Sequence, residues 1–568
     1  MNTVEQTPLS QGVLGGSVPW PRIALVRVSL QAPRQLAFAV FAAVVFLTTV
    51  FVATFDEHAL YLHPGLAAQA VRAVVPLGAG VVALYAIYRP WRAFLAILLL
   101  TPFWNAVQVS WRVGPLQVIL QTVFVGALAV GYLRWRRSRV GKVAEESISV
   151  EPALDGRTYS GLAAVVRWAA GFEAYRFAEA ATLGLLGVAV LSTLASPDFT
   201  LSSTVLLHGI LEPVGLGAIL VGLRPTRRDL VTLAIVLGSS AALGALLNIL
   251  QALPSMTSFE ALQAQRLVFA RVTYFNVGLF GVVLAMVVPL VVGILACRRS
   301  LRLRPRATRM LVAVLAACLV GLFLTLSKSA YLATALGSVL LLVLLVSTWQ
   351  RRAAIVLTAA VLSSALIPWP ALVLQIAPAI SGAYRTAAVA MVGESRFDSW
   401  NPTTLAGRGS LAERFYAVEA AVHMSQDHPL LGIGLDQFGR YYVDLGYRPS
   451  EARDRFDHAH SLFPEIAAEL GLVAMVLVVV IYATCLWALW RIYRAPPDGK
   501  TRALAAALFA SLVGWLIAAT AFGCDIYRPD RDLSSDVVTM AVIVAASIAL
   551  TRISSARRGR PPLDRPNV

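Results

Sequence analysis

The chain has 568 residues, of which 58% are hydrophobic and only 14% are charged, and its mean hydropathy is +0.71. Soluble proteins carry about 25% charged residues, so this composition excludes an ordinary soluble enzyme and indicates a chain that lies mostly inside a membrane. The formal net charge is +17, but most basic residues lie between apolar runs, where membrane topology explains them, and no nucleic-acid-binding motif accompanies them. We therefore expect no nucleic acid partner.

About fourteen apolar runs are long enough to cross a bilayer as helices. We therefore predict an all-α polytopic membrane protein with about 14 transmembrane helices. In chain order the runs cover, to within several residues, 35–55, 71–88, 91–111, 115–133, 178–197, 203–223, 230–253, 274–297, 310–327, 329–348, 354–376, 461–490, 501–522 and 535–551.

Arginine-rich connectors follow the even-numbered runs, whereas the connectors after odd-numbered runs are poor in basic residues. Because basic loops stay on the cytoplasmic side, both termini are expected there and the longest polar segment is expected outside. The organisation that follows is a cytoplasmic tail (1–34), N-terminal transmembrane helices (35–142), a cytoplasmic loop (143–177), central transmembrane helices (178–376), a large extracytoplasmic loop (377–460), C-terminal transmembrane helices (461–551) and a cytoplasmic tail (552–568).

The large loop has the pattern of ordered structure. Residues 410–425 have helical spacing, with Leu411, Phe415, Val418, Ala421 and Val422 on one side. A turn at 427–434 ends this helix, and Gly432 and Gly434 permit a backbone that a side chain would forbid. We expect a helical cap over the membrane face.

Two histidines, His458 and His460, stand where this polar loop meets the next apolar run. Glu465 and Glu469 follow one and two helical turns into that run, and an ionisable residue inside a span usually faces a polar cavity. A histidine there can act as a general base near neutral pH. Metal binding is the rival interpretation, but His-x-His is a weak ligand pattern and no third ligand has a telling spacing.

Several of these stretches together resemble the O-antigen ligase/polymerase superfamily of bacterial membrane glycosyltransferases. Its members show a His-Pro-x-x-Gly-x-Gly turn, a His-x-His-Asn motif, a later Glu-x-Gly, a Thr-x-Ser-Arg segment, and an Arg followed by Phe-x-x-Asn. The corresponding residues cover about 200–490 and are Asp427 to Gly434, His458 to Phe463, Glu469 to Leu472, Phe323 to Ala330, and Arg271 to Asn276. Two positions depart from the pattern: Ser461 replaces the usual Asn, and Lys328 replaces the usual Arg.

The resemblance implies a GT-C-like fold in the bacterial cytoplasmic (inner) membrane, with its active site facing the periplasm. It implies a lipid-linked donor, a glycan on undecaprenyl diphosphate, whose sugar passes to an acceptor hydroxyl on a glycan or lipid. His460 is the first candidate for the base, with His458 as its neighbour or substitute. Glu465, Glu469, Gly432 and Gly434 would support the site. The candidates for binding the diphosphate are Arg414, Arg408, Arg271 and Lys328. With cations in that role, no cofactor and no metal is expected.

Other interpretations remain open at this stage. Arg414 could pair with a loop carboxylate, Arg271 could be an interfacial anchor, and Glu469 could be a polar contact between helices. Ligation and repeat-unit polymerisation are not separated by the sequence, since acceptor choice depends on loop shape. A transporter of polysaccharide or lipid-linked substrate is the alternative function, although no inverted repeat is visible. A membrane scaffold without catalysis is a third possibility.

Overall fold

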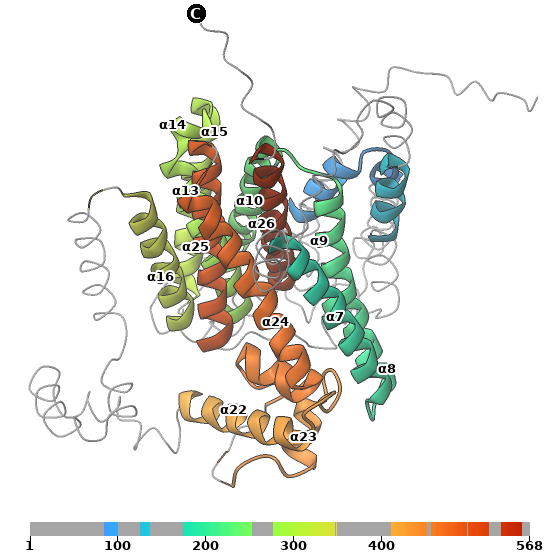
Figure 1. Ribbon diagram of the computed structural model, residues 1–568. Coiled ribbons are helices and arrows are strands. Elements are labelled where there is room, and N and C mark those ends of the chain that lie inside the picture. Colours follow the sequence, from blue (N-terminus) through green and yellow to red (C-terminus); the bar gives the residue numbers. More distant parts are fainter. Residues whose placement is uncertain are drawn as a thin grey trace, which may run out of the picture. The chain divides into compact units, whose positions relative to one another are not determined.

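The computed structural model describes residues 84–99, 125–136, 174–252, 277–325, 327–346, 348, 410–450, 452, 456–496, 498–521 and 535–558. Every regular element in these ranges is a helix (Figure 1). Seven of the described helices are long and apolar enough to cross a membrane. The protein is therefore an all-α polytopic membrane protein, as the composition predicts. The runs at 35–55 and 354–376, the loop 143–173 and residues 377–409 lie outside the described residues.

The helices begin and end close to the predicted runs. Short helical stretches occupy 84–88, 90–99 and 125–136. The longer elements are α7 (Ala174–Ala195), α8 (Phe199–Val205), η1 (Leu206–Leu211), α9 (Glu212–Gly222), α10 (Arg227–Ala252), α13 (Val277–Ala296), α14 (Arg298–Leu301), α15 (Pro305–Leu324), α16 (Lys328–Leu345), α22 (Ser410–Asp427), α23 (Phe438–Asp444), α24 (Leu462–Arg494), α25 (Gly499–Ala521) and α26 (Ser535–Arg558).

Helix α13 is the most enclosed span, with 83% of its apolar window buried, and it packs against α25, α16, α10 and α15. Small residues let these helices approach closely: a methyl group added to Gly293 would lie 2.6 Å from Cβ of Ala507. Such contacts replace the hydrophobic effect as the cause of helix association in lipid. Helices α7 and α15 are only 28% and 33% buried in their windows, so they present wide apolar faces to their surroundings.

Helices α8 and α9 form one span that is interrupted by the π-helical turn η1. Pro213 stands just after this turn and has no N–H to donate to the residue four positions earlier, which accounts for a local change of register. Inside the turn Nδ1 of His208 lies 3.1 Å from Oε2 of Glu212, and both side chains are buried. Glu212 therefore pairs with a buried group.

Helices α22 and α23 lie at the end of α24 where that helix begins (Figure 1). The predicted helix at 410–425 is confirmed. Of the residues expected on one side of it, Ala421 is buried but Val422 is 41% exposed. The apolar residues that α22 buries are Ala417, Ala420, Ala421 and Met424. Alanines allow α22 to lie close against α24, which a face of larger residues would prevent.

Candidate active site

The site is built around a break in α24. At Gly471 the backbone has φ 86° and ψ 169°, so the helix consists of a short first half, Leu462–Leu470, and a long second half. A residue with a side chain rarely adopts this conformation, which explains the glycine. A break leaves backbone groups without their helical partners, and these groups must bond elsewhere.

The turn at 428–434 supplies those partners. The N–H groups of Ile433 and Gly434 donate to the carbonyls of Ala468 and Glu469, at 2.9 and 3.0 Å. On the other side of the break, the N–H of Leu472 donates to the carbonyl of Pro429 at 2.8 Å. The two motifs that the sequence shows separately, the glycine turn and the Glu-x-Gly, thus form one backbone-to-backbone joint.

Close approach explains both glycines of the turn. Gly432 has φ +68°, and a methyl group there would lie 2.3 Å from the carbonyl carbon of Glu469. Gly434 has φ +101°, and a methyl group there would lie 2.5 Å from Oγ of Ser196. The left-handed backbone and the close contacts therefore explain why glycine occupies both positions.

The histidine pair lies directly before the first half of α24. Nε2 of His458 and Nδ1 of His460 are 2.9 Å apart, and the two rings are 3.9 Å apart between centroids. His460 has φ +55°, a left-handed conformation in which its ring stands edge-on to Phe456 at 4.5 Å. A bond between two ring nitrogens needs one proton and one lone pair, so this contact persists only while at least one of the two rings is neutral.

The acidic residues Glu465 and Glu469 are each 1% exposed, within the first half of α24. Oε1 of Glu469 accepts a hydrogen bond from the N–H of Phe438 at 3.3 Å and so ties the start of α23 to α24. Within the described part of the chain, no group of three or more His, Cys, Asp and Glu side chains is arranged to hold a metal ion.

Three serines, one in α7, one in α8 and one in the connection between them, hold the joint in place, and sequence reasoning missed them. Ser192 donates to the carbonyl of Glu469 at 3.0 Å, and Ser202 donates to the carbonyl of Leu435 at 2.7 Å. Ser196 bonds to Ser202 at 2.7 Å. A cluster of serines at the end of one apolar run and the start of the next, Ser192 to Ser203, was the only visible indication in the sequence.

An apolar cavity of about 720 Å³ begins beside the first half of α24. Leu462 and Ile466 line it at that end, Tyr482 and Trp515 line it further along, and Glu179 and Arg552 line it where α7 and α26 meet in an ion pair. The cavity therefore extends between the first half of α24 and the helix ends at which α26 finishes. Its walls suit a hydrocarbon chain and not a sugar.

The predicted cation candidates are only partly placed. Arg414 lies on α22, the helix that packs against α24. Lys328 is the first residue of α16, which begins near the end of α25; Thr520 of that end accepts a hydrogen bond from Ser461 at 2.8 Å. The backbone of Lys328 is thus at the same end of the bundle as the histidines. Arg271 and Arg408 lie outside the described residues.

These features define a polytopic membrane protein with a paired-histidine site beside an apolar cavity. Residues 312–479 match the family model described as O-antigen ligase. The resemblance seen in the sequence is confirmed, since the matched residues include the glycine turn, both histidines and both buried glutamates. No curated protein matches the chain.

Proposed function

We propose that the protein is a membrane glycosyltransferase that moves a glycan from undecaprenyl diphosphate to an acceptor hydroxyl. The observation that carries this proposal is the bonded pair His458–His460 within the O-antigen ligase segment. Acceptor hydroxyls are poor nucleophiles, and a positioned imidazole can take their proton as the new bond forms. The reaction is ligation to a lipid or glycan, or polymerisation of repeat units.

The pair suits a base that gains one proton. In the proposed resting state, the Nδ1–H group of His460 donates a hydrogen bond to Nε2 of His458. The other ring nitrogen of His460, Nε2, then carries a lone pair. This nitrogen takes the acceptor proton while the acceptor oxygen bonds to the anomeric carbon. The bond from that carbon to the diphosphate oxygen breaks, and the lipid diphosphate leaves. The His458–His460 bond survives the transfer, because only His460 becomes charged.

The remaining parts of the substrate have suitable surroundings. The cavity beside Leu462 and Ile466 fits a segment of the polyprenyl tail, since its lining is predominantly apolar. Arg414 and Lys328 are the described candidates for the diphosphate. A guanidinium binds phosphate oxygens through two hydrogen bonds, whereas a lysine supplies a point charge. Arg271 and Arg408 complete the proposed set of cations.

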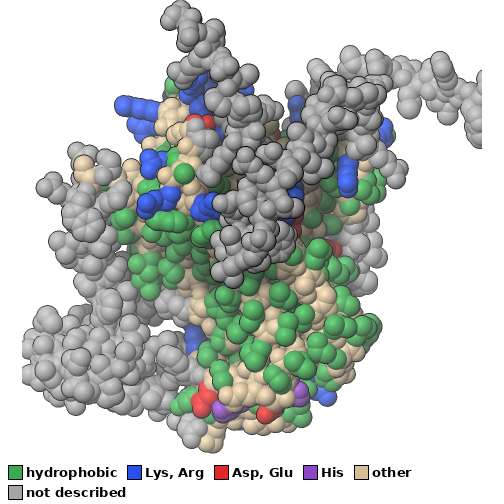
Figure 2. All heavy atoms as spheres, viewed as in Figure 1, with side chains coloured by type: hydrophobic (Ala, Val, Ile, Leu, Met, Phe, Trp, Pro, Cys, Tyr) green, Lys and Arg blue, Asp and Glu red, His purple; other side chains and the backbone are tan. Residues whose placement is uncertain are grey.

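We place the site on the outer face of the bacterial cytoplasmic membrane. The arginine-rich connectors after α9, α13 and α24 gather at the end of the bundle opposite α22 and α23 (Figures 1 and 2). The positive-inside rule then puts the histidine pair outside, where lipid-linked glycans are presented.

The test uses a deletion strain complemented with the wild-type chain, with His460→Asn, or with His423→Asn. Asparagine tolerates the left-handed backbone of residue 460, so the substitution removes the base with little strain. His423 is an exposed histidine of α22 and serves as the matched control. Extracted surface glycans are separated on a gel, and protein level is measured by blot.

Loss of attached glycan with accumulated lipid-linked polymer identifies a ligase, and accumulation of single repeat units identifies a polymerase. The wild type and His423→Asn restore the normal pattern, whereas His460→Asn does not. Surface glycans that are unchanged in the deletion strain contradict the proposal.

One observation favours the alternative, a transporter. Carrier sites lie near the membrane midplane, and the buried His208–Glu212 pair is in the middle of its span. A transporter would lose function when this pair is removed and keep it in His460→Asn, so the same assay separates the two functions.

A further inference from the structure

Six arginines crowd the connection between α13 and α15. Half of the residues from Arg298 to Arg309 are arginines, and this segment contains no acidic residue. All six side chains are exposed: Arg298, Arg299, Arg302, Arg304, Arg306 and Arg309. Figure 2 shows Lys and Arg side chains gathered at the α14–α15 end of the molecule, above a band of apolar side chains.

The local backbone concentrates this charge. The short helix α14 ends at Arg302, whose φ of +53° is left-handed, a position where glycine is usual. Arg304 is the N-cap of α15 but makes no side-chain cap, and no acidic residue lies in the first turn of that helix. Arg306 therefore stands at a helix N-terminus, where the helix dipole disfavours a cation and favours an anion.

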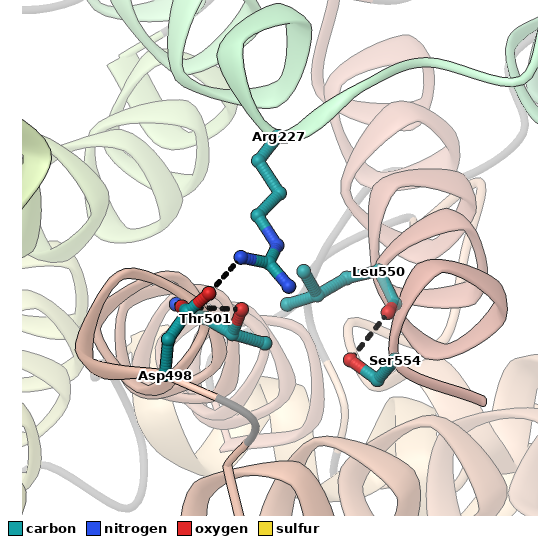
Figure 3. Close-up of polar contacts among 5 residues, drawn as sticks. All are labelled: Arg227, Asp498, Thr501, Leu550 and Ser554. Carbon is teal, nitrogen blue, oxygen red and sulfur yellow. Dashed lines mark hydrogen bonds and ion pairs between the residues drawn. The ribbon is translucent and has the colours of Figure 1, made fainter. Parts of the chain in front are cut away.

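The arginines elsewhere at this end of the bundle mostly have partners. Arg227 pairs with Asp498, which also accepts hydrogen bonds from Thr501 (Figure 3). Arg552 pairs with Glu179. Arg491 and Arg494 lie over the rings of Trp487 and Trp490 at 4.7 and 5.7 Å. Among the described residues, no carboxylate or aromatic ring engages any guanidinium of the 298–309 cluster.

An apolar stripe continues directly from the cluster along α15. Arg306 and Arg309 share a helix face with Val320 and Phe323, at spacings of three and four residues and their multiples. Val320 is 47% exposed and Phe323 is 62% exposed. One face of α15 thus carries guanidinium groups at its start and exposed hydrocarbon for the rest of its length.

We propose that the 298–309 cluster and the exposed face of α15 bind an anionic phospholipid. Its phosphate lies among the guanidinium groups and the free N–H groups that begin α15, and its acyl chains lie along the half of the stripe nearest the arginines, since the chains of one leaflet cover half of the bilayer core. Guanidinium binds phosphate oxygens in pairs of hydrogen bonds, and the stripe excludes water from the chains. Clusters of four to eight basic residues beside a span are typical of anionic lipid sites.

Membrane topology alone does not account for this arrangement. Positive charge in a short connector orients a span wherever the arginines sit. It does not require them at a helix N-terminus, in a left-handed position, or in register with an exposed apolar face. A bound anion explains why cations gather at a helix N-terminus that would otherwise disfavour them.

The experiment measures lipid binding to the purified full-length chain by native mass spectrometry, with phosphatidylglycerol and phosphatidylcholine as probes. The test variant is Arg306→Gln with Arg309→Gln. The matched control is Arg224→Gln with Arg228→Gln, two exposed arginines at the same end of the bundle that have Asp229 close by in sequence. Thermal unfolding without added lipid checks that both variants fold.

We expect the test variant to bind phosphatidylglycerol about tenfold more weakly than the wild type, and the control to bind within about threefold of it. Phosphatidylcholine binding should be unchanged in both. Equal losses in test and control, or no loss in the test variant, overturn the proposal. Inorganic phosphate at millimolar concentration should not displace the lipid; if it does, the cluster binds phosphate itself and the lipid assignment is wrong.

A second variant distinguishes a ligand site from a structural one. Arg302→Gly removes a guanidinium group and also relieves the strain of a left-handed backbone at a residue with a side chain. The variant protein should therefore unfold at the same temperature as the wild type or at a higher one. A purely structural role for Arg302 predicts lower stability and unchanged lipid affinity. The proposal predicts unchanged or higher stability in detergent and weaker binding of phosphatidylglycerol.

Discussion

Gly432 and Glu469 meet backbone to backbone, at a distance that leaves no room for a single methyl group between them. Gly432→Ala should therefore destabilise the protein in two ways, through a left-handed φ of +68° and through collision with the carbonyl of Glu469. We expect a loss of about 3 kcal/mol in the free energy of unfolding, measured by thermal or denaturant unfolding in detergent.

Gly446→Ala is the matched control for that variant. Gly446 has φ +82°, but a methyl group there would meet nothing within 4 Å. Its loss should be only the cost of the left-handed backbone, about 1 kcal/mol. Equal losses for the two alanines would show that the joint between the turn and α24 is looser than the structure has it.

The bonded imidazoles predict how activity depends on pH. Since the His458–His460 contact persists only while at least one ring is neutral, adding a second proton should break it. Transfer activity should fall as the pH decreases. The variant His458→Asn should retain part of the activity, and its pH–rate profile should fall with a different shape at acidic pH. The measurement is a pH–rate profile with purified protein. An identical profile for wild type and His458→Asn would contradict coupling between the rings.

Tyr447 donates a hydrogen bond of 2.6 Å to Asp427 and so ties the end of α22 to the residues after α23. This bond, with some help from burial, raises the pKa of Tyr447 to about 12. The folded pKa is above the usual 10, so the stabilisation is complete below pH 10 and is lost as the pH rises towards 12. Tyr447→Phe should cost about 0.5 kcal/mol at neutral pH, since the pair is exposed.

The difference between wild type and Tyr447→Phe should be constant from pH 6 to 9 and should shrink above about pH 10. Unfolding of the wild type and the variant, followed across this range, measures it. A difference that is unchanged at high pH would show that the hydroxyl contributes by packing and not by its hydrogen bond.

Asp498 joins α10 to the start of α25 through Arg227 and Thr501 (Figure 3). Burial acts to raise the pKa of its carboxyl, but the hydrogen bonds from Thr501 and the charge of Arg227 outweigh it and lower the pKa below the usual 3.8. The stabilisation is therefore present above about pH 4 and is lost as the pH falls through the lowered pKa. Asp498→Asn keeps an amide oxygen for Thr501 and removes only the charge. We expect a loss of about 0.5–1 kcal/mol at pH 7, and this loss should shrink as the pH falls through the lowered pKa of Asp498.

The buried His208–Glu212 pair should behave non-additively. Glu212→Leu alone leaves a buried histidine without its carboxylate and should cost about 2–3 kcal/mol. The double variant His208→Leu with Glu212→Leu removes both polar groups and should cost less than the sum of the single changes. Additive losses in thermal unfolding would mean that the two side chains do not act as a pair.

Much of this architecture can be predicted from the sequence, because a chain segment inside lipid must satisfy its own backbone hydrogen bonds. Long apolar runs must form helices, and so α13 and α25 begin and end within a few residues of their predicted runs. The histidine pair and the glycine turn were also visible, because each is a compact local motif. Most of the residues that α22 buries could not be identified from the sequence. They are mostly alanines, because α24 lies too close for larger side chains, and hydrophobicity alone does not single them out.

The joint itself was beyond sequence reasoning. Gly471 was visible as part of the Glu-x-Gly motif, but only the structure shows that it breaks the helix and that Ile433 and Gly434 bond to the carbonyls before the break. Ser192 and Ser202 contribute hydroxyls to carbonyls more than 200 positions away. Such long-range backbone contacts leave no periodic pattern, so the part of the site that α7 and α8 provide could not be predicted.

The broken helix also has a consequence for which positions of this chain can vary. Its joint is made of main-chain groups, which every residue carries, so positions of the turn other than Gly432 and Gly434 can change their side chains without loosening it. Leu430, at the tip of the turn, is 71% exposed although its neighbours in the chain hold the joint. Substitutions at such exposed positions can therefore change the surface of the turn while the backbone that adjoins the histidine pair stays in place.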